Sequence, residues 1–134
     1  MIFIDSSAFI SYFVENDVNH EKVQKIFNEI LEEKLITSSD VIVETLNWLT
    51  RKASKKIMHE LGEILLNEDI AKIIHTDTDD KLAALEIIKK YSDYNLSFTD
   101  ALSFALIKRL KIKRIFSLDK GFDLLKGVIN VFYI

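Results

Sequence analysis

The stretch SFTDALSFALIKRLKIKRIFSLDKGF at residues 97–122 decides the expected fold, because it joins a helical pattern to a strand-like one. Apolar residues recur at helical spacing after Asp100, and a second apolar run, which ends just before Asp119, is typical of a buried strand. Asp100 is therefore expected in the first turn of a helix, and Asp119 at the C-terminal end of a strand. In an open parallel α/β sheet both positions face one crevice, where ligands usually bind.

The rest of the chain repeats this alternation of short apolar runs and helical patterns. Strands are expected at residues 1–4, 35–37, 70–75, 112–118 and 128–134. Helices, one of them over residues 20–33, fill the intervals, and Gly127 is expected to end a last short helix near residues 122–125. The order β-α-α-β-α-α-β-α-α-β-α-β predicts one domain over residues 1–134. Its expected class is α/β, with a parallel sheet of about five strands and helices on both faces.

Composition narrows the class of protein. At 134 residues, of which 49% are hydrophobic, the chain is long enough to bury the core of one domain. A net charge of -3 argues against a protein that coats nucleic acid by bulk electrostatics, although basic residues concentrate after residue 100. The absence of cysteine excludes disulfides, thiolate zinc sites and cysteine nucleophiles. Since no apolar run is long enough to span a bilayer and the N-terminus does not resemble a signal peptide, a soluble cytoplasmic protein without a membrane partner is expected.

Two further isolated acids fall at positions like those of Asp100 and Asp119. Asp5 directly follows the first expected strand, and Glu44 lies in the first two turns of a later helix. If the crossovers are right-handed, all four carboxylates lie at the C-terminal edge of the sheet. Each alone has a simpler explanation, as a helix cap, a surface residue or a turn. Their joint placement favours a common site.

Clustered carboxylates repel one another and raise each other's pKa unless a cation neutralises them. Because hard divalent cations prefer oxygen ligands, the sequence predicts a Mg2+ or Mn2+ site. Its expected ligands and catalytic residues are Asp5, Glu44, Asp100 and Asp119. Such a site supports hydrolysis of phosphodiester bonds, in which the carboxylates mainly position the metal and any one of them can act as the base. Neighbouring hydroxyls that can hold water or orient a carboxylate are Ser6, Thr99 and Ser117.

Other polar residues have other interpretations. Asp77, Asp79 and Asp80 are expected to cap a helix, and the three histidines lack metal-ligand spacing and are expected on the surface or in the core. Ten basic residues can line an approach for a phosphate backbone, or simply form solvated helix faces. They are Arg51, Lys52, Lys55, Lys56, Lys108, Arg109, Lys111, Lys113, Arg114 and Lys120.

Together these residues resemble the PIN-domain family, and within it the VapC-type toxins of toxin–antitoxin pairs. The matching segments are MIFIDSSAFI, the helix with Glu44, SFTDALSFALIKRL and RIFSLDKGFDLL, in the expected order. The resemblance implies a Rossmann-like parallel sheet, an acidic Mg2+ or Mn2+ site and cleavage of single-stranded RNA. It also implies a homodimer that a cognate antitoxin inhibits. By motif position, the metal-site acids are Asp5, Glu44, Asp100 and Asp119.

The chain departs from the family pattern in one place, and alternatives to the leading hypothesis stay open. Many members carry another acid shortly after the fourth one, where this chain has Lys120 and Gly121 before Asp123, so the number of metal ions is open. A ribonuclease toxin is the leading hypothesis, and an RNA-processing nuclease or a DNase would use the same site. A non-enzymatic Mg-binding, receiver-like interaction module would need a paired acidic cluster after the first strand, where this chain has only Asp5.

Overall fold

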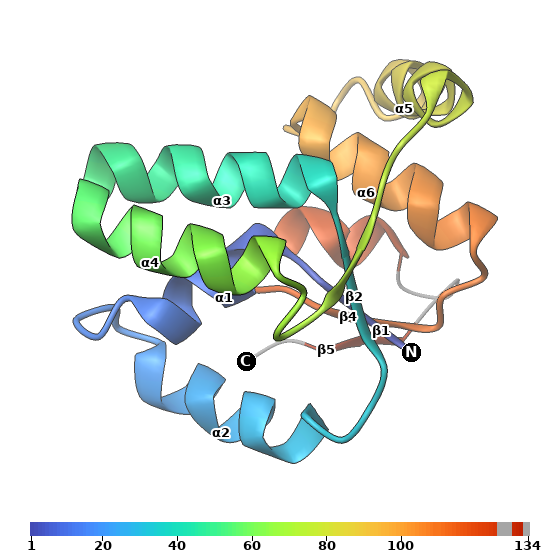
Figure 1. Ribbon diagram of the computed structural model, residues 1–134. Helices are drawn as coiled ribbons and strands as arrows, with labels where there is room; N and C mark the ends of the chain where they lie inside the picture. Colours follow the sequence, from blue (N-terminus) through green and yellow to red (C-terminus); the bar gives the residue numbers. More distant parts are fainter. Residues whose placement is uncertain (126–129, 133–134) are drawn as a thin grey trace.

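The computed structural model describes residues 1–125 and 130–132, which form one parallel sheet flanked by helices (Figure 1). The strands are β1 (Ile2–Ile4), β2 (Leu35–Ser38), β3 (Lys72–Ile74), β4 (Arg114–Phe116) and β5 (Asn130–Phe132). Their order in the sheet is β3-β2-β1-β4-β5, and every neighbouring pair is parallel. β1 to β4 form the body of the sheet, and the short β5 joins its edge by pairing with β4. The predicted parallel α/β class is confirmed.

The helices fall into two groups in Figure 1. Their bounds are α1 (Ser6–Phe13), α2 (His20–Ile30), α3 (Ser39–Lys52), α4 (Lys55–Leu66), α5 (Thr78–Lys90), α6 (Phe98–Arg109) and the 3-10 helix η1 (Lys120–Leu125). α1 to α4 precede β3, whereas α5 and α6 connect β3 to β4 across the middle of the sheet. By the crossover rule the two groups belong to opposite faces of the sheet, although α3 of the first group contacts α6 of the second. Across the described residues, none of the helices combines the length and the apolar character that crossing a bilayer requires.

Some elements are shorter than the sequence pattern predicts. The helix expected over residues 20–33 ends at Ile30, whose carbonyl accepts the N–H of Glu33 in a turn. β4 begins only at Arg114, because Lys111 adopts a left-handed φ of 54° and the next N–H still bonds back to α6. The expected break at Gly127 lies outside the described residues, as do the ends of the strand expected over residues 128–134.

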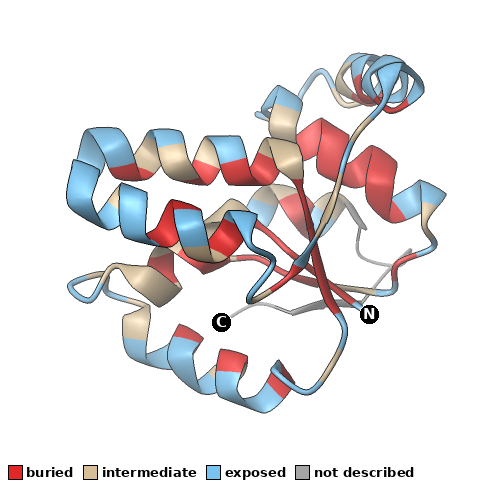
Figure 2. Ribbon diagram, in the orientation of Figure 1, coloured by how far each residue is buried: buried red, intermediate tan, exposed pale blue. Residues whose placement is uncertain are grey.

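The core lies on both faces of β1, whose three residues are fully buried. On one face Phe27 contacts Phe116 of β4, with ring centroids 5.2 Å apart. On the other, α6 is buried on almost its whole surface between Asp100 and Ile107, which is the red helix at the upper right of Figure 2. A helix that is apolar all round belongs in the interior. α6 is therefore a rigid core element, and its first turn is fixed in position.

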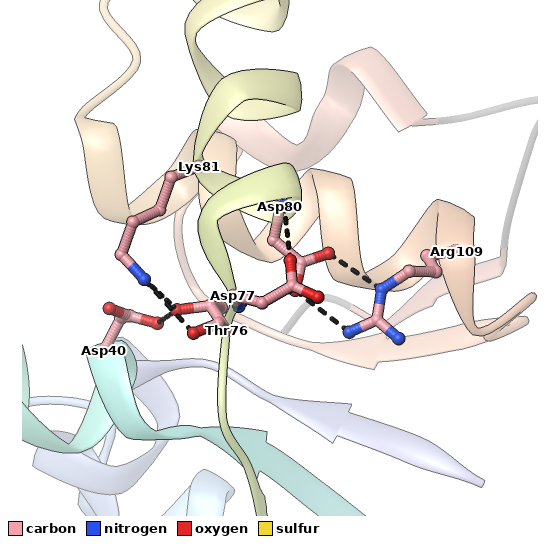
Figure 3. Close-up of polar contacts among 6 residues, drawn as sticks. All are labelled: Asp40, Thr76, Asp77, Asp80, Lys81 and Arg109. Carbon is pink, nitrogen blue, oxygen red and sulfur yellow. Dashed lines mark hydrogen bonds and ion pairs between the residues drawn. The ribbon is translucent and has the colours of Figure 1, made fainter.

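α5 is attached to α6 by an ion pair at the N-terminus of α5 (Figure 3). Asp77 and Asp80 form a capping box, as the sequence predicts for this acidic cluster. The Arg109 guanidinium donates to both oxygens of Asp80, at 2.7 and 3.0 Å. Asp80 is 3% exposed, and the hydrogen bond from Arg109 is the main reason why its pKa is lowered.

Replacing Arg109 with Met is expected to destabilise the fold, because it leaves the buried Asp80 carboxylate without its cation. The expected loss is about 1–2 kcal/mol of unfolding free energy, less than the roughly 3–5 kcal/mol of a fully buried pair, because the Arg109 side chain is 47% exposed. Urea denaturation measures the change. Lys108→Met, at the neighbouring exposed position, is the control and should leave the denaturation midpoint unchanged. Equal midpoints for the two variants would contradict this role of the pair.

Candidate functional site

The four acids singled out in the sequence come from four separate segments and line one pocket of about 300 Å³. Asp5 follows β1 and caps α1, Glu44 lies in the second turn of α3, and Asp100 lies in the first turn of α6. Asp119 lies between β4 and η1. The other lining residues are Ser6, Ser7, Asn95 and Ser97. We call this pocket the carboxylate pocket.

Asp5 is the most buried of the four acids, at 2% exposure. Its Oδ2 accepts hydrogen bonds from the hydroxyls of Ser7, at 2.7 Å, and Ser117, at 2.9 Å. Its other oxygen, Oδ1, is also buried and has no hydrogen-bond partner among the described residues. Burial raises the pKa of Asp5, although the two serine hydroxyls oppose the shift. One oxygen of Asp5 is therefore fixed by the protein, and the other is left without a partner.

Asp100 is held by the helix that it begins. Ser97, the N-cap of α6, accepts the N–H of Asp100 at 3.0 Å and donates its own N–H to Asp100 Oδ2 at 3.2 Å. Burial raises the pKa of Asp100 to about 7, and the negative charges of Asp5 and Asp119 add to the shift. A carboxyl group with this pKa is partly protonated at neutral pH. The pocket thus concentrates more negative charge than its surroundings compensate.

Glu44 and Asp119 are oriented by short polar contacts at the pocket rim. The Ser6 hydroxyl donates to Glu44 Oε2 at 2.7 Å, across 38 residues of chain. Asp119 Oδ1 accepts the N–H of Gly121 at 2.8 Å, and the N–H of Asp119 donates to the Ser117 hydroxyl at 2.9 Å. The positions of Ser6 and Ser117 therefore fit the orienting role expected from the sequence.

Two hydroxyls differ from the sequence-based expectation. Thr99 does not line the carboxylate pocket but an adjoining one, although its neighbour Asp100 lies in the former. Ser7, which the sequence analysis did not single out, contacts several residues of the site. Besides its bond to Asp5, its hydroxyl accepts the N–H of Leu118 at 2.9 Å and lies 3.2 Å from the Ser117 hydroxyl. Its position two residues after a helix-capping aspartate was the available signal.

The donor set of the pocket fits a hard divalent cation. All four acids offer carboxylate oxygens, Asp5 Oδ1 is buried without a hydrogen-bond partner in the described part of the chain, and the pKa values of Asp5 and Asp100 are both raised. Within the described residues, however, no three His, Asp or Glu side chains are close enough together to hold an ion on their own. An ion with few direct protein ligands and several waters, as is usual for Mg2+, suits such an open arrangement.

The remaining titratable groups lie elsewhere. His20 Nδ1 is 2.9 Å from the Ser11 carbonyl, and His59 forms an exposed pair with Glu63. His75 is exposed. None of the three lines the carboxylate pocket, in agreement with their assignment to surface or core. Of the basic residues, Arg114 is engaged by Glu33.

Comparison with known proteins finds a matching family and several similar proteins. Residues 2–128 match the PIN domain family. "Ribonuclease VapC1" of Aquifex aeolicus (strain VF5) is 27% identical over 90% of this chain and 83% of its own length. "23S rRNA-specific endonuclease VapC20" of Mycobacterium tuberculosis is 25% identical over 92% of each chain.

Solved structures share the fold. The crystal structure of Mycobacterium tuberculosis VapC20, described as a Sarcin-Ricin loop cleaving toxin, superposes with a TM-score of 0.86 at 21% identity, covering 92% of this chain and 94% of the other. FitAcB from Neisseria gonorrhoeae superposes with a TM-score of 0.73 at 17% identity, covering 98% and 96%. Since the family match spans nearly the whole chain, this protein belongs to the PIN domain family.

Proposed function

We propose that this protein is a divalent-metal-dependent endoribonuclease that hydrolyses phosphodiester bonds of single-stranded RNA, and that it is the toxin of a toxin–antitoxin pair. One observation carries the proposal: carboxylates from four separate segments share a pocket in which one buried carboxylate oxygen has no hydrogen-bond partner among the described residues. Membership of the PIN domain family and the ribonuclease names of similar proteins support it. We assign the catalytic and metal-binding roles to Asp5, Glu44, Asp100 and Asp119.

The proposed cofactor is Mg2+ or Mn2+. When bound, such an ion activates water and stabilises the charge that develops on the phosphate during in-line displacement. The protein's own residues position the acids. Ser7 and Ser117 hold one oxygen of Asp5, so that Oδ1 is left for a ligand. Ser97 fixes Asp100 and Ser6 fixes Glu44, which limits the rotamer freedom that ligand binding would otherwise cost.

The proposed partners follow the same reasoning. One chain of a solved toxin–antitoxin complex from Klebsiella pneumoniae has a similar fold, with a TM-score of 0.69 and 13% identity to this chain. We therefore propose a cognate antitoxin as protein partner, a homodimer as the assembly and the cytoplasm as the location. Growth arrest on expression, relieved by the product of a small neighbouring reading frame, would support the toxin role. Cleavage without growth arrest would favour an RNA-processing enzyme instead.

Asp5→Asn and Asp100→Asn are each expected to abolish RNA cleavage while the fold is kept. The loss should exceed the roughly 10–100-fold that removal of an outer partner of a metal ligand costs. Cleavage of a labelled single-stranded RNA in Mg2+ or Mn2+, followed on a denaturing gel, measures it, and far-UV circular dichroism checks the fold. Asp79→Asn, an exposed position in the first turn of α5, is the matched control. Undiminished metal-dependent cleavage by both site variants would refute the assignment, and cleavage of DNA alone would replace the substrate.

Stability without metal should fall as the pH rises from about 4 to about 7. In this window the unfolded chain has already lost the Asp100 proton, at its ordinary pKa of 3.8, whereas the folded protein keeps it until about 7. The folded state therefore binds more protons, and raising the pH favours unfolding. Melting temperatures in a chelating buffer measure the slope, which should flatten in Asp100→Asn.

Mg2+ should reverse this slope, because a bound cation favours the ionised acids. The increase in melting temperature with Mg2+ is expected to be larger at about pH 8 than at about pH 5. An equal increase at both values, or none, would argue against a cation at these carboxylates. A protein with a flat pH profile in the chelating buffer would argue against the raised pKa of Asp100.

A further inference from the structure

A second pocket adjoins the carboxylate pocket on the side where α3 and α6 lie next to each other (Figure 1). Its volume is about 330 Å³, at the small end of pockets that take small organic groups. We call it the α3–α6 pocket. Glu44 lines both pockets, so the two adjoin at this residue. A ligand chain that has a phosphate at the carboxylates can therefore place a neighbouring group in the α3–α6 pocket.

The first turn of α6 divides its side chains between the two pockets. Ser97 and Asp100 line the carboxylate pocket, whereas Phe98 and Thr99 line the α3–α6 pocket. The capping box between Ser97 and Asp100 fixes this turn, and the helix behind it is buried. Phe98 is therefore held beside the carboxylates on rigid backbone.

Phe98 presents an aromatic ring to the solvent. The residue is 41% exposed, and within the described residues its ring has no aromatic neighbour. Across the pocket, Val43 of α3 is 58% exposed. Exposed apolar groups that line a pocket rimmed by polar residues mark a binding surface rather than a core. An aromatic ring at such an edge suits a flat partner, because stacked rings bury apolar area on both faces.

The α3 wall of this pocket is polar and charged. Asp40, Asn47 and Arg51 lie on one helical face, since they are separated by seven and four residues. Thr76 donates to Asp40 Oδ2 at 2.7 Å and is itself held by Lys81 Nζ at 3.0 Å, so the Asp40 carboxylate is fixed (Figure 3). Arg51, by contrast, has no carboxylate partner within the described part of the chain. The wall therefore offers hydrogen-bonding groups and an available guanidinium.

We propose that the α3–α6 pocket binds one unpaired nucleobase of the RNA, next to the phosphate at the carboxylates, with Phe98 stacked on the base and Arg51 on a backbone phosphate. This proposal rests on the proposed ribonuclease function. Stacking on an aromatic ring is available to every unpaired base, so Phe98 supplies affinity without sequence preference. Asn47 can both donate and accept, and Asp40 only accepts, so these two favour a base with an amino group at its edge.

Equilibrium binding of short RNAs tests the proposal, with Asp100→Asn in every protein so that the RNA stays uncut. Fluorescence anisotropy is measured with labelled single-stranded homopolymers of each base, and with a ribose-phosphate oligomer that carries no bases. Phe98→Ala should weaken binding of the homopolymers about tenfold, whereas Phe98→Tyr should restore it. The same variant should bind the base-free oligomer as tightly as its parent does. Leu82→Ala, which removes an exposed apolar side chain on α5, is the matched control.

Arg51→Met provides a second, independent arm. It should weaken binding of the homopolymers and of the base-free oligomer by the same factor, and it should lower the dependence of binding on salt. A Phe98→Ala loss that is absent, or equal with and without bases, overturns the proposed stacking. A change in the oligomeric state of Phe98→Ala, measured by sedimentation, would instead assign the pocket to a protein interface and also overturns it.

The failure of this proposal can be distinguished from failure of the nuclease function. These cleavage assays use proteins that keep Asp100. If metal-dependent cleavage is the same with and without Phe98→Ala, only the base site is refuted. Binding that depends on Phe98 and on the presence of bases, in a protein whose unmutated form cleaves no RNA, would keep the base site and refute the nuclease.

Discussion

The burial of the Asp5 carboxylate is the constraint on which the rest of the site depends. β1 is the middle strand of the sheet, and Asp5, which directly follows it, is buried and not at an open surface. A carboxylate in such a place needs hydrogen bonds or a cation. Within the described residues, Ser7 and Ser117 provide hydrogen bonds to Oδ2, and Oδ1 has no partner. Ser7 after β1 and Ser117 after β4 therefore stabilise a carboxylate that an apolar environment alone would destabilise.

α6 gives the site its second support. A helix that is buried on nearly all sides cannot rotate or shift without opening cavities in the core, and cavities are costly. Its first turn carries Asp100 on one side and Phe98 on another, so the same helix positions the backbone of both residues. The ion pair between Asp80 and Arg109 joins α5 to α6. The hydrogen bond from Thr76, just before α5, to Asp40 then joins this unit to α3. The two pockets thus share the first turn of α6 as a wall.

The sequence predicted the class of the fold and the gathering of four acids in one place, because those signals are local. An acid that directly follows a buried strand, such as Asp5 or Asp119, is visible in the order of residue types, and the parallel topology brings such positions to one edge. The hydroxyl network was only partly predictable. The spacing of Ser97 and Asp100 is a capping-box pattern and could have been found. Thr99, expected beside the acids, lines the adjoining pocket, because one residue along a helix turns a side chain by about 100°. The contact between Asp80 and Arg109 spans 29 residues, and no local pattern specifies it.

The position of β1 in the sheet also determines when the carboxylate pocket can come into existence during synthesis. β1 precedes one of its two neighbours in the sheet, β4, by more than 100 residues, so β1 is synthesised well before β4. The N–H of Asp5 donates to the carbonyl of Phe116, and its carboxylate accepts a hydrogen bond from Ser117, which lies 112 residues later. Neither bond can form until this later segment has been synthesised. A nascent or prematurely terminated chain therefore carries Asp5, Glu44 and Asp100 without the segment that assembles them. The order of the strands makes the assembled pocket depend on a segment that is synthesised after three of its four acids.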